Sequence, residues 1–173
     1  MRKHLAVLGV ATVLLTGCSA QATPTTSSAP AAAATTAAST PTPTPTPTVA
    51  ADATSVATAL KAKVATITAV TTVTEELDSN KLLGRPGQYT SLAWITDSGA
   101  KAGETGTDGG AVVEVFANED DAKTRSEYIL GVLKKMGPAF GTEWHHLDGA
   151  TLLRVSGQLT PAMNDQYTAA FGK

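Results

Sequence analysis

The chain has 173 residues, a formal net charge of −2 and a single cysteine, and 16% of its residues are charged. A mildly acidic chain with scattered lysines lacks the basic surface that nucleic acid binding requires, so we expect no nucleic acid partner. With only Cys18 available, an intramolecular disulfide and a cysteine-based metal site are both excluded.

The N-terminal segment has the features of an export signal. Arg2 and Lys3 precede an apolar run from Leu5 to Leu15. At about 11 residues this run is shorter than the ~20 that a membrane-spanning helix needs. We therefore predict that residues 1–17 are a signal peptide, removed at Cys18.

The segment Leu15-Thr16-Gly17-Cys18 resembles the bacterial lipobox, in which the cysteine thiol receives a diacylglyceryl group and becomes the new N-terminus. The resemblance implies that Cys18 carries acyl chains such as palmitate. It also implies an anchor on the extracytoplasmic face of the cell membrane, since two or more acyl chains hold a protein durably. The alternatives are a plain signal peptide or a buried helix that contains one cysteine.

Residues 18–50 form the next compositional unit. After Cys18 they are dominated by Ala, Thr, Pro and Ser, carry no charge, and end in the Pro-Thr repeat of residues 41–48. Because no large apolar side chain offsets the entropy of ordering, we expect a disordered, semi-rigid tether. A glycosylated stalk and a proline-rich ligand for another protein are the alternatives.

Residues 51–173 are expected to fold as a single α+β domain. Hydrophobic periodicity and turn residues predict helices near 53–64, over 119–136 and from 161 onward, and strands at 66–74, 89–96, 111–116, 143–147 and 150–156. The order α-β-β-β-α-β-β-α favours helices packed on one face of an antiparallel sheet.

Local signals fix the ends of two of these helices. Asn118 is a suitable N-cap for the second helix, and Gly137-Pro138 ends it. Thr160 caps the last helix, with Pro161 at its first position. An apolar stripe on the second helix indicates its buried face, formed by Ala122, Ile129, Val132, Leu133 and Met136.

Asp148-Gly149 predicts a two-residue hairpin turn. The predicted register places Trp144 opposite Leu153, Glu143 opposite Arg154 and His145 opposite Leu152. Alternation then assigns Trp144 to the core face, and Glu143, His145 and Arg154 to the other face. These three polar residues are expected to form an exposed ion pair beside a solvated histidine, stabilising by about 0.2–1 kcal/mol.

The sequence contains no complete catalytic or metal-binding motif that we recognise. His145 and His146 are adjacent on a strand, so they point to opposite faces and cannot share a metal. Residues 78–80 match the first positions of a calcium-binding loop, but the ligands that should follow them are missing. Ser98 and Lys101 have the Ser-x-x-Lys spacing of penicillin-binding enzymes, but the other motifs of those enzymes do not occur in the chain. We therefore predict no cofactor, metal or catalytic residue. The alternative, a small cell-wall hydrolase, would use Glu143, His145 and Arg154, or Asp78 and Asp97.

Several stretches together resemble a group of small lipoproteins from actinobacteria and their phages or prophages. They are residues 82–90 (LLGRPGQYT), 114–116 (EVF), 122–125 (AKxR), 128–129 (YI) and 149–161. The last of these stretches runs from the hairpin to the cap of the final helix. The group has no assigned chemistry, so the resemblance implies location and fold. It also implies one alternative function, which is a prophage lipoprotein that excludes other phages.

The loop from Leu82 to Gln88 is the candidate partner-binding segment. Arg85 offers a planar guanidinium between two glycines, suited to a carboxylate or phosphate. Arg85, Gln88, Glu143, His145 and Arg154 are thus the candidate partner contacts. A structural alternative is that Leu82 and Leu83 close the core while Arg85 caps a carbonyl or pairs with Glu76. The sequence favours a non-enzymatic, lipid-anchored envelope protein that binds an envelope or phage protein.

Overall fold

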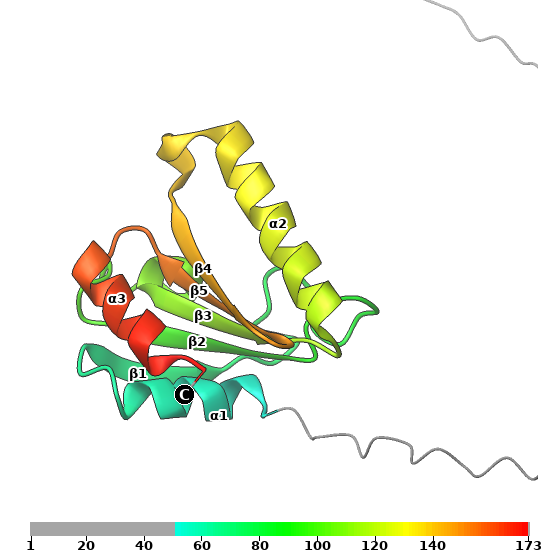
Figure 1. Cartoon of the computed structure of the whole chain (residues 1–173), viewed down its shortest axis with the longest axis horizontal. Coiled ribbons are helices and arrows are strands. Elements are labelled where there is room, and N and C mark those ends of the chain that lie inside the picture. Colours follow the sequence, from blue (N-terminus) through cyan, green and yellow to red (C-terminus); the bar gives the residue numbers. More distant parts are fainter. Residues whose placement is uncertain (1–50, 173) are drawn as a thin grey trace, which may run out of the picture. The chain divides into compact units, whose positions relative to one another are not determined.

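The computed structural model describes residues 51–172, so the predicted signal peptide, Cys18 and the predicted tether lie outside the described residues. The described part holds a five-stranded antiparallel sheet and three α-helices, which confirms the α+β prediction. The sheet order is β1-β2-β3-β5-β4 (Figure 1). Its elements are α1 (Ala53–Lys61), β1 (Ile67–Thr72), β2 (Ser91–Asp97), η1 (Gly106–Gly109), β3 (Gly110–Val115), α2 (Glu119–Met136), η2 (Pro138–Phe140), β4 (Glu143–Asp148), β5 (Thr151–Ser156) and α3 (Pro161–Ala170).

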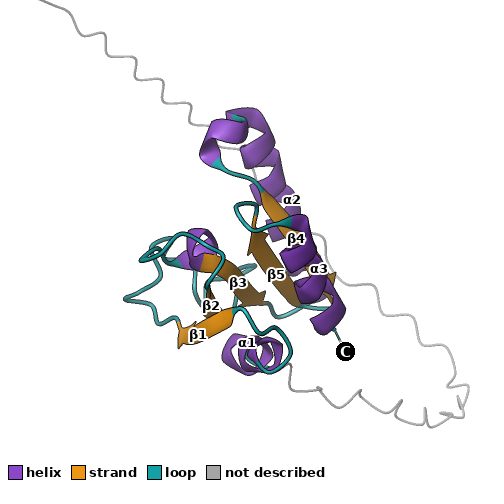
Figure 2. Cartoon of the chain, turned by 90° about the vertical axis from the view of Figure 1, so that its left-hand side faces the viewer, coloured by secondary structure: helices purple, strands orange, loops and turns teal. Residues whose placement is uncertain are grey.

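The helices cover both faces of the sheet, which corrects the prediction that they share one face. One core cluster joins α1 and α3 to Ala111, Val113 and Val155. The second cluster lies on the opposite face and includes Ala122 of α2 and Leu152 of β5. The physical reason is that every residue of β3 is buried, and a strand whose side chains are buried on both faces needs cover on both. In Figure 2, α1 lies beside the β1 end of the sheet and α2 beside the β4 end.

The predicted helix caps are confirmed. Asn118 accepts a hydrogen bond from the backbone N–H of Asp121, and α2 ends at Gly137, whose φ is 80°. Thr160 accepts from the N–H of Met163 at the start of α3. The predicted apolar stripe is only partly correct, because burial ends near Ile129 and Met136 is 47% exposed.

The hairpin exists, but its register differs from the predicted one by two residues. The innermost pair is Asp148 with Thr151, so Gly149-Ala150 forms the turn. Gly149 takes a φ of 52°, a left-handed value that glycine adopts without strain. Trp144 is opposite Val155 and His145 is opposite Arg154. A shift of two residues preserves the side-chain alternation, and the predicted faces are therefore correct.

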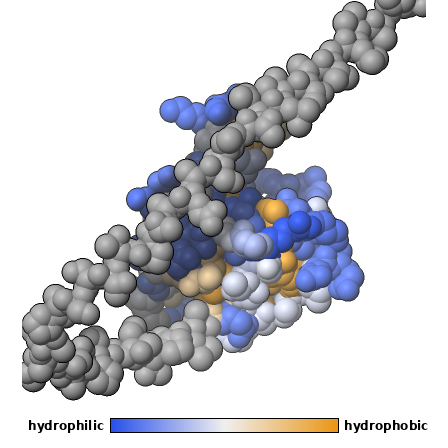
Figure 3. Space-filling view, turned by 90° about the vertical axis from the view of Figure 1, so that its right-hand side faces the viewer, coloured by the Kyte–Doolittle hydropathy of each residue, from blue (hydrophilic) through white to orange (hydrophobic). Residues whose placement is uncertain are grey.

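No helix within residues 51–172 is long and apolar enough to cross a bilayer. On the face in Figure 3, small apolar patches are separated by hydrophilic residues.

Candidate functional site

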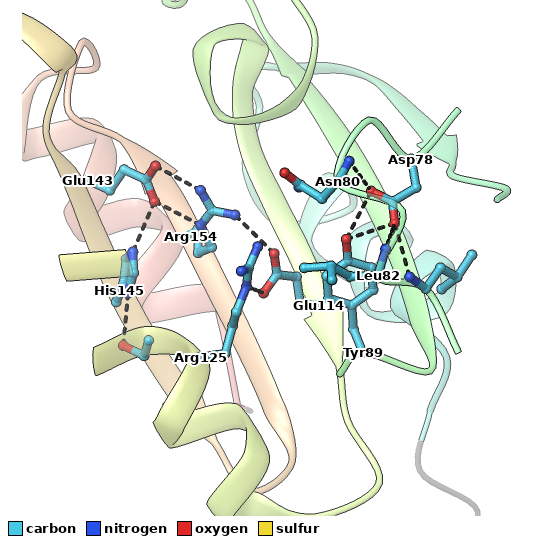
Figure 4. A network of polar contacts seen from close by, with 11 residues as sticks. Asp78, Asn80, Leu82, Tyr89, Glu114, Arg125, Glu143, His145 and Arg154 are labelled. Atoms are coloured by element: carbon cyan, nitrogen blue, oxygen red, sulfur yellow. Dashed lines mark hydrogen bonds and ion pairs between the residues drawn. The ribbon is translucent and has the colours of Figure 1, made fainter. Parts of the chain in front are cut away.

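Five charged or titratable side chains form a continuous cluster between the sheet and α2, here called the ion network (Figure 4). Arg154 donates from Nε and Nη2 to the two oxygens of Glu143, both at 2.8 Å. Its Nη1 donates to Glu114 Oε1 at 2.9 Å. Arg125 of α2 reaches Glu114 Oε2 at 3.4 Å, and His145 contacts Glu143 Oε2 at 2.9 Å. The contact between Arg125 and Glu114 thereby joins α2 to the sheet through opposite charges.

Strand register places these groups on one face. Val112 of β3 pairs with Arg154, which in turn pairs with His145 on β4. Glu114 lies two residues beyond Val112 and therefore shares its face. Glu143 stands diagonal to Arg154 rather than opposite it, and long side chains bridge that distance. The contact predicted from the sequence thus forms although the pairing is shifted.

The ion network is buried, which corrects the expectation of an exposed pair and a solvated histidine. The side chain of Glu114 is 1% exposed, and those of Glu143 and Arg154 are 11% and 12% exposed. The cause is α2, which lies over this face and contacts both β4 and β5. The hairpin pattern alone contains no information on which helix covers it.

The network controls the ionisation of Glu143. Burial alone would raise the pKa of this carboxyl, but hydrogen bonds from His145 and Arg154, together with the charge of Arg154, hold the pKa at about 2. Burial likewise opposes the charge on Arg154, and the hydrogen bond to Glu143 with the charge of Glu114 outweighs it, so the pKa of Arg154 is raised. Both groups are therefore charged at neutral pH.

A hydrogen-bond chain missed by the sequence reasoning links Ser126, His145 and Glu143. The Ser126 hydroxyl lies 2.8 Å from His145 Nδ1, and Nε2 lies 2.9 Å from Glu143. An ionised carboxylate only accepts, so Nε2 donates, and in a neutral imidazole Nδ1 then accepts from the hydroxyl. One sequence signal was available. Ser126 lies between Ala122 and Ile129 at helical spacing, inside the apolar stripe.

Serine, histidine and carboxylate follow one another here in the same order as in the catalytic triad of a hydrolase. The surroundings of the three residues differ from those of such a triad in two respects. Ser126 is 5% exposed in the middle of α2, so a substrate carbonyl cannot reach its oxygen in this conformation. Glu143 also shares Oε2 between His145 and Arg154. The arrangement can hold α2 on the sheet, and chemistry at Ser126 would require α2 to move.

Two other buried carboxylates, Asp78 and Asp97, accept hydrogen bonds from loop N–H groups and from a tyrosine hydroxyl. Asp78 accepts from the N–H groups of Leu82 and Leu83 and from the Tyr89 hydroxyl at 2.9 Å. Burial disfavours its charge, but these bonds outweigh burial and lower the pKa of Asp78. Burial, together with the Asp78 carboxylate, raises the pKa of Tyr89. Asp78 therefore fixes the fold of the 77–83 loop.

Asp97 has the same role on the opposite face of the sheet. Its carboxylate accepts from Thr66, from the Gly99 N–H and from the hydroxyl of Tyr167 on α3 at 2.8 Å. Asp78 is bonded to Tyr89 of the second core cluster and Asp97 to Tyr167 of the first, on opposite faces of the sheet, so the fold does not bring the two carboxylates together as the hydrolase alternative required.

The loop predicted to bind a partner is partly anchored. Leu82 and Leu83 pack against the second core cluster, and Nε of Arg85 donates to the Lys81 carbonyl, as the structural alternative predicted. The rest of the Arg85 side chain is exposed beside a hollow of about 510 Å³. Gln88 lies at another groove, of about 450 Å³, against Arg125 and Tyr128 of α2. Arg85 and Gln88 thus lie outside the ion network.

No three His, Cys, Asp or Glu side chains within residues 51–172 are grouped so as to hold a metal ion. His145 and His146 face opposite sides of the sheet, as predicted, since His146 Nε2 contacts Asn164 of α3 at 2.8 Å.

Comparison of the chain with models of known protein families, with curated proteins and with solved structures finds no match.

Proposed function

We propose that this chain is a lipoprotein of the bacterial cell envelope, anchored through Cys18, whose folded domain binds a partner outside the membrane without chemical conversion. The observation that carries the proposal is Leu15-Thr16-Gly17-Cys18 at the end of a short apolar run. The peptidase cleft and the lipid transferase require small residues and a thiol at that point, and both are present.

The folded domain supports the binding half of the proposal. Its buried side-chain polar atoms all have hydrogen-bond partners within the described residues, which is typical of a rigid scaffold. Two hollows adjoin the 75–88 loop, where Arg85 is exposed and Gln88 is half-buried. A fixed scaffold that carries surface loops is the usual arrangement in binding proteins. The phage resemblance of residues 82–90 makes a phage-encoded or envelope protein the first partner class to test.

Membrane fractionation of cells that produce Cys18→Ser tests the anchor, because a serine hydroxyl cannot receive the thioether lipid. The variant should leave the membrane fraction after a high-salt wash and lose incorporation of labelled palmitate. Ser19→Ala is the matched control and should stay membrane-bound. Retention of Cys18→Ser on membranes would refute the lipid anchor.

A hydrolase is the second candidate, and the Ser126–His145–Glu143 chain is the observation that favours it. A fluorophosphonate reagent labels an activated serine, so it distinguishes the two candidates. Labelling of the wild type that is lost in Ser126→Ala would support the hydrolase. The binding proposal expects no labelling at this position, because Ser126 is buried.

A further inference from the structure

A hollow of about 370 Å³ opens on the sheet face beside the ion network, between the 77–80 loop and the residues around η1. We propose that this sheet hollow binds a neutral, polyhydroxylated ring, such as an uncharged sugar unit of an envelope glycan. The inference rests on the proposed envelope location and names the ligand class for the binding function.

The floor of the sheet hollow is set by strand register. Trp94 on β2 pairs with Val112 on β3, which pairs with Arg154 on β5, so the three side chains lie in one row on the same face. Neighbouring strands are about 4.8 Å apart, which separates Trp94 from Arg154 by about 10 Å. That span matches the width of one to two sugar rings.

Trp94 provides an aromatic surface at one end of this row. One side of the residue packs against the second core cluster, and the residue also lines the hollow. It is only half-buried because α2, which lies on the same face, contacts β4 and β5 at the other edge of the sheet. A held indole with an accessible part is a rigid platform for the C–H face of a sugar ring.

The charges around the hollow oppose an anionic ligand. Glu114 and Glu143 are balanced by Arg125 and Arg154 within the ion network. Asp78, whose pKa is lowered, adds one negative charge, and its oxygens already accept hydrogen bonds. A phosphate or carboxylate would therefore meet no surplus positive charge, and a neutral ligand avoids the cost of desolvating a charge.

The rim supplies groups that both donate and accept hydrogen bonds. Ser79 and Asn80 line one wall, and Thr105 and Thr107 line the other. Hydroxyl and amide groups can pair with sugar hydroxyls in either direction. Both walls are held in place, because Asp78 accepts from the Asn80 N–H at 3.0 Å and Gln158 donates to Asp108 of η1 at 3.1 Å. Such preorganisation lowers the entropy cost of binding.

Tryptophan fluorescence can report on this hollow alone. The chain has two tryptophans, and Trp144 packs against the first core cluster on the other face, so a Trp144→Phe background leaves only Trp94. Titration of that protein with tetra-N-acetylchitotetraose should give a saturable change in emission at concentrations up to about 10 mM. Tetragalacturonate, the anionic probe, should give none.

Variants localise the binding. Asn80→Ala should weaken the response roughly tenfold, while Asn164→Ala on the opposite face should leave it unchanged. Trp94→Leu, followed by calorimetry, should abolish binding, and Trp94→Phe should retain part of it while confirming that the fold survives. Absence of a saturable response to the neutral probe, or an equal response in Asn80→Ala, would overturn the inference.

The failures of the two proposals are distinguishable. Release of Cys18→Ser from membranes together with no response to the sugar rejects only the ligand class. Retention of Cys18→Ser on membranes rejects the lipid anchor, whatever the titration shows.

Discussion

Replacing Arg154 by methionine should destabilise the domain far more than a surface ion pair would. The substitution keeps the aliphatic stem of the side chain but removes three charge-assisted hydrogen bonds to two carboxylates. Glu114 would keep only the 3.4 Å contact with Arg125, and Glu143 only the contact with His145. Both carboxylates would remain buried, and such a loss costs about 3–5 kcal/mol in free energy of unfolding.

The assay is urea unfolding of the purified protein at pH 7, followed by circular dichroism. A domain of this size has a total stability of about 5–15 kcal/mol, so the predicted loss is a large fraction of it. The matched control is Lys101→Met, which breaks the exposed pair of Lys101 with Glu104, 64% and 41% exposed, and should cost under about 1 kcal/mol.

The pH dependence of the loss identifies its cause. Without Arg154, the buried carboxylates favour protonation, so the difference between variant and wild type should shrink from pH 7 to pH 5. A loss that matches the Lys101→Met control would refute the argument that the network is buried and energetically coupled. A large but pH-independent loss would show that packing, rather than charge, is responsible.

Two further predictions concern acid and the 77–83 loop. The pKa of Glu143 is about 2 in the folded protein against an ordinary 4.5, so its contribution to stability, roughly 3 kcal/mol, is complete above pH 4.5 and should be lost as the pH falls toward 2. Unfolding of Glu143→Gln measured between pH 4.5 and pH 2 checks this, because the variant should lose less stability than the wild type over that range. Asp78→Ala leaves the half-buried Leu82 and Leu83 N–H groups without their acceptor and should cost about 2–4 kcal/mol, measured by thermal unfolding. Tyr89→Phe removes one hydrogen bond and should cost about 1 kcal/mol; an equal loss in the two variants would contradict the loop-fixing role of Asp78.

Features governed by neighbours in sequence could be predicted. The caps at Asn118 and Thr160 and the stop at Gly137 follow from short-range rules on hydrogen bonds and glycine, and the structure has all three. The hairpin faces could also be predicted, although two adjacent two-residue turns compete around Gly149. Because the competing registers differ by two residues, the choice changes the partner of Trp144 without changing its face.

Features governed by distant segments could not be predicted. Nothing in the hairpin sequence indicates that α2 covers it. Without that information, the sequence predicts that Glu143 and Arg154 form an exposed ion pair. The clearest unused signal was Glu114, which stands within the apolar run of residues 111–116. A glutamate in a buried strand needs cationic partners, and these come from Arg125 and Arg154, 11 and 40 residues away in sequence.

The same polar groups position α2 on the sheet. An apolar stripe alone allows a helix to slide or rotate with little loss, but Arg125 must meet Glu114 while Ser126 meets His145. These adjacent residues satisfy two buried partners only at one rotation and one height of the helix. That position keeps α2 over β4 and β5 and leaves Trp94 partly accessible at the sheet hollow. The buried charges that complicated the prediction of the site therefore also determine where the open part of the sheet, the proposed ligand site, lies.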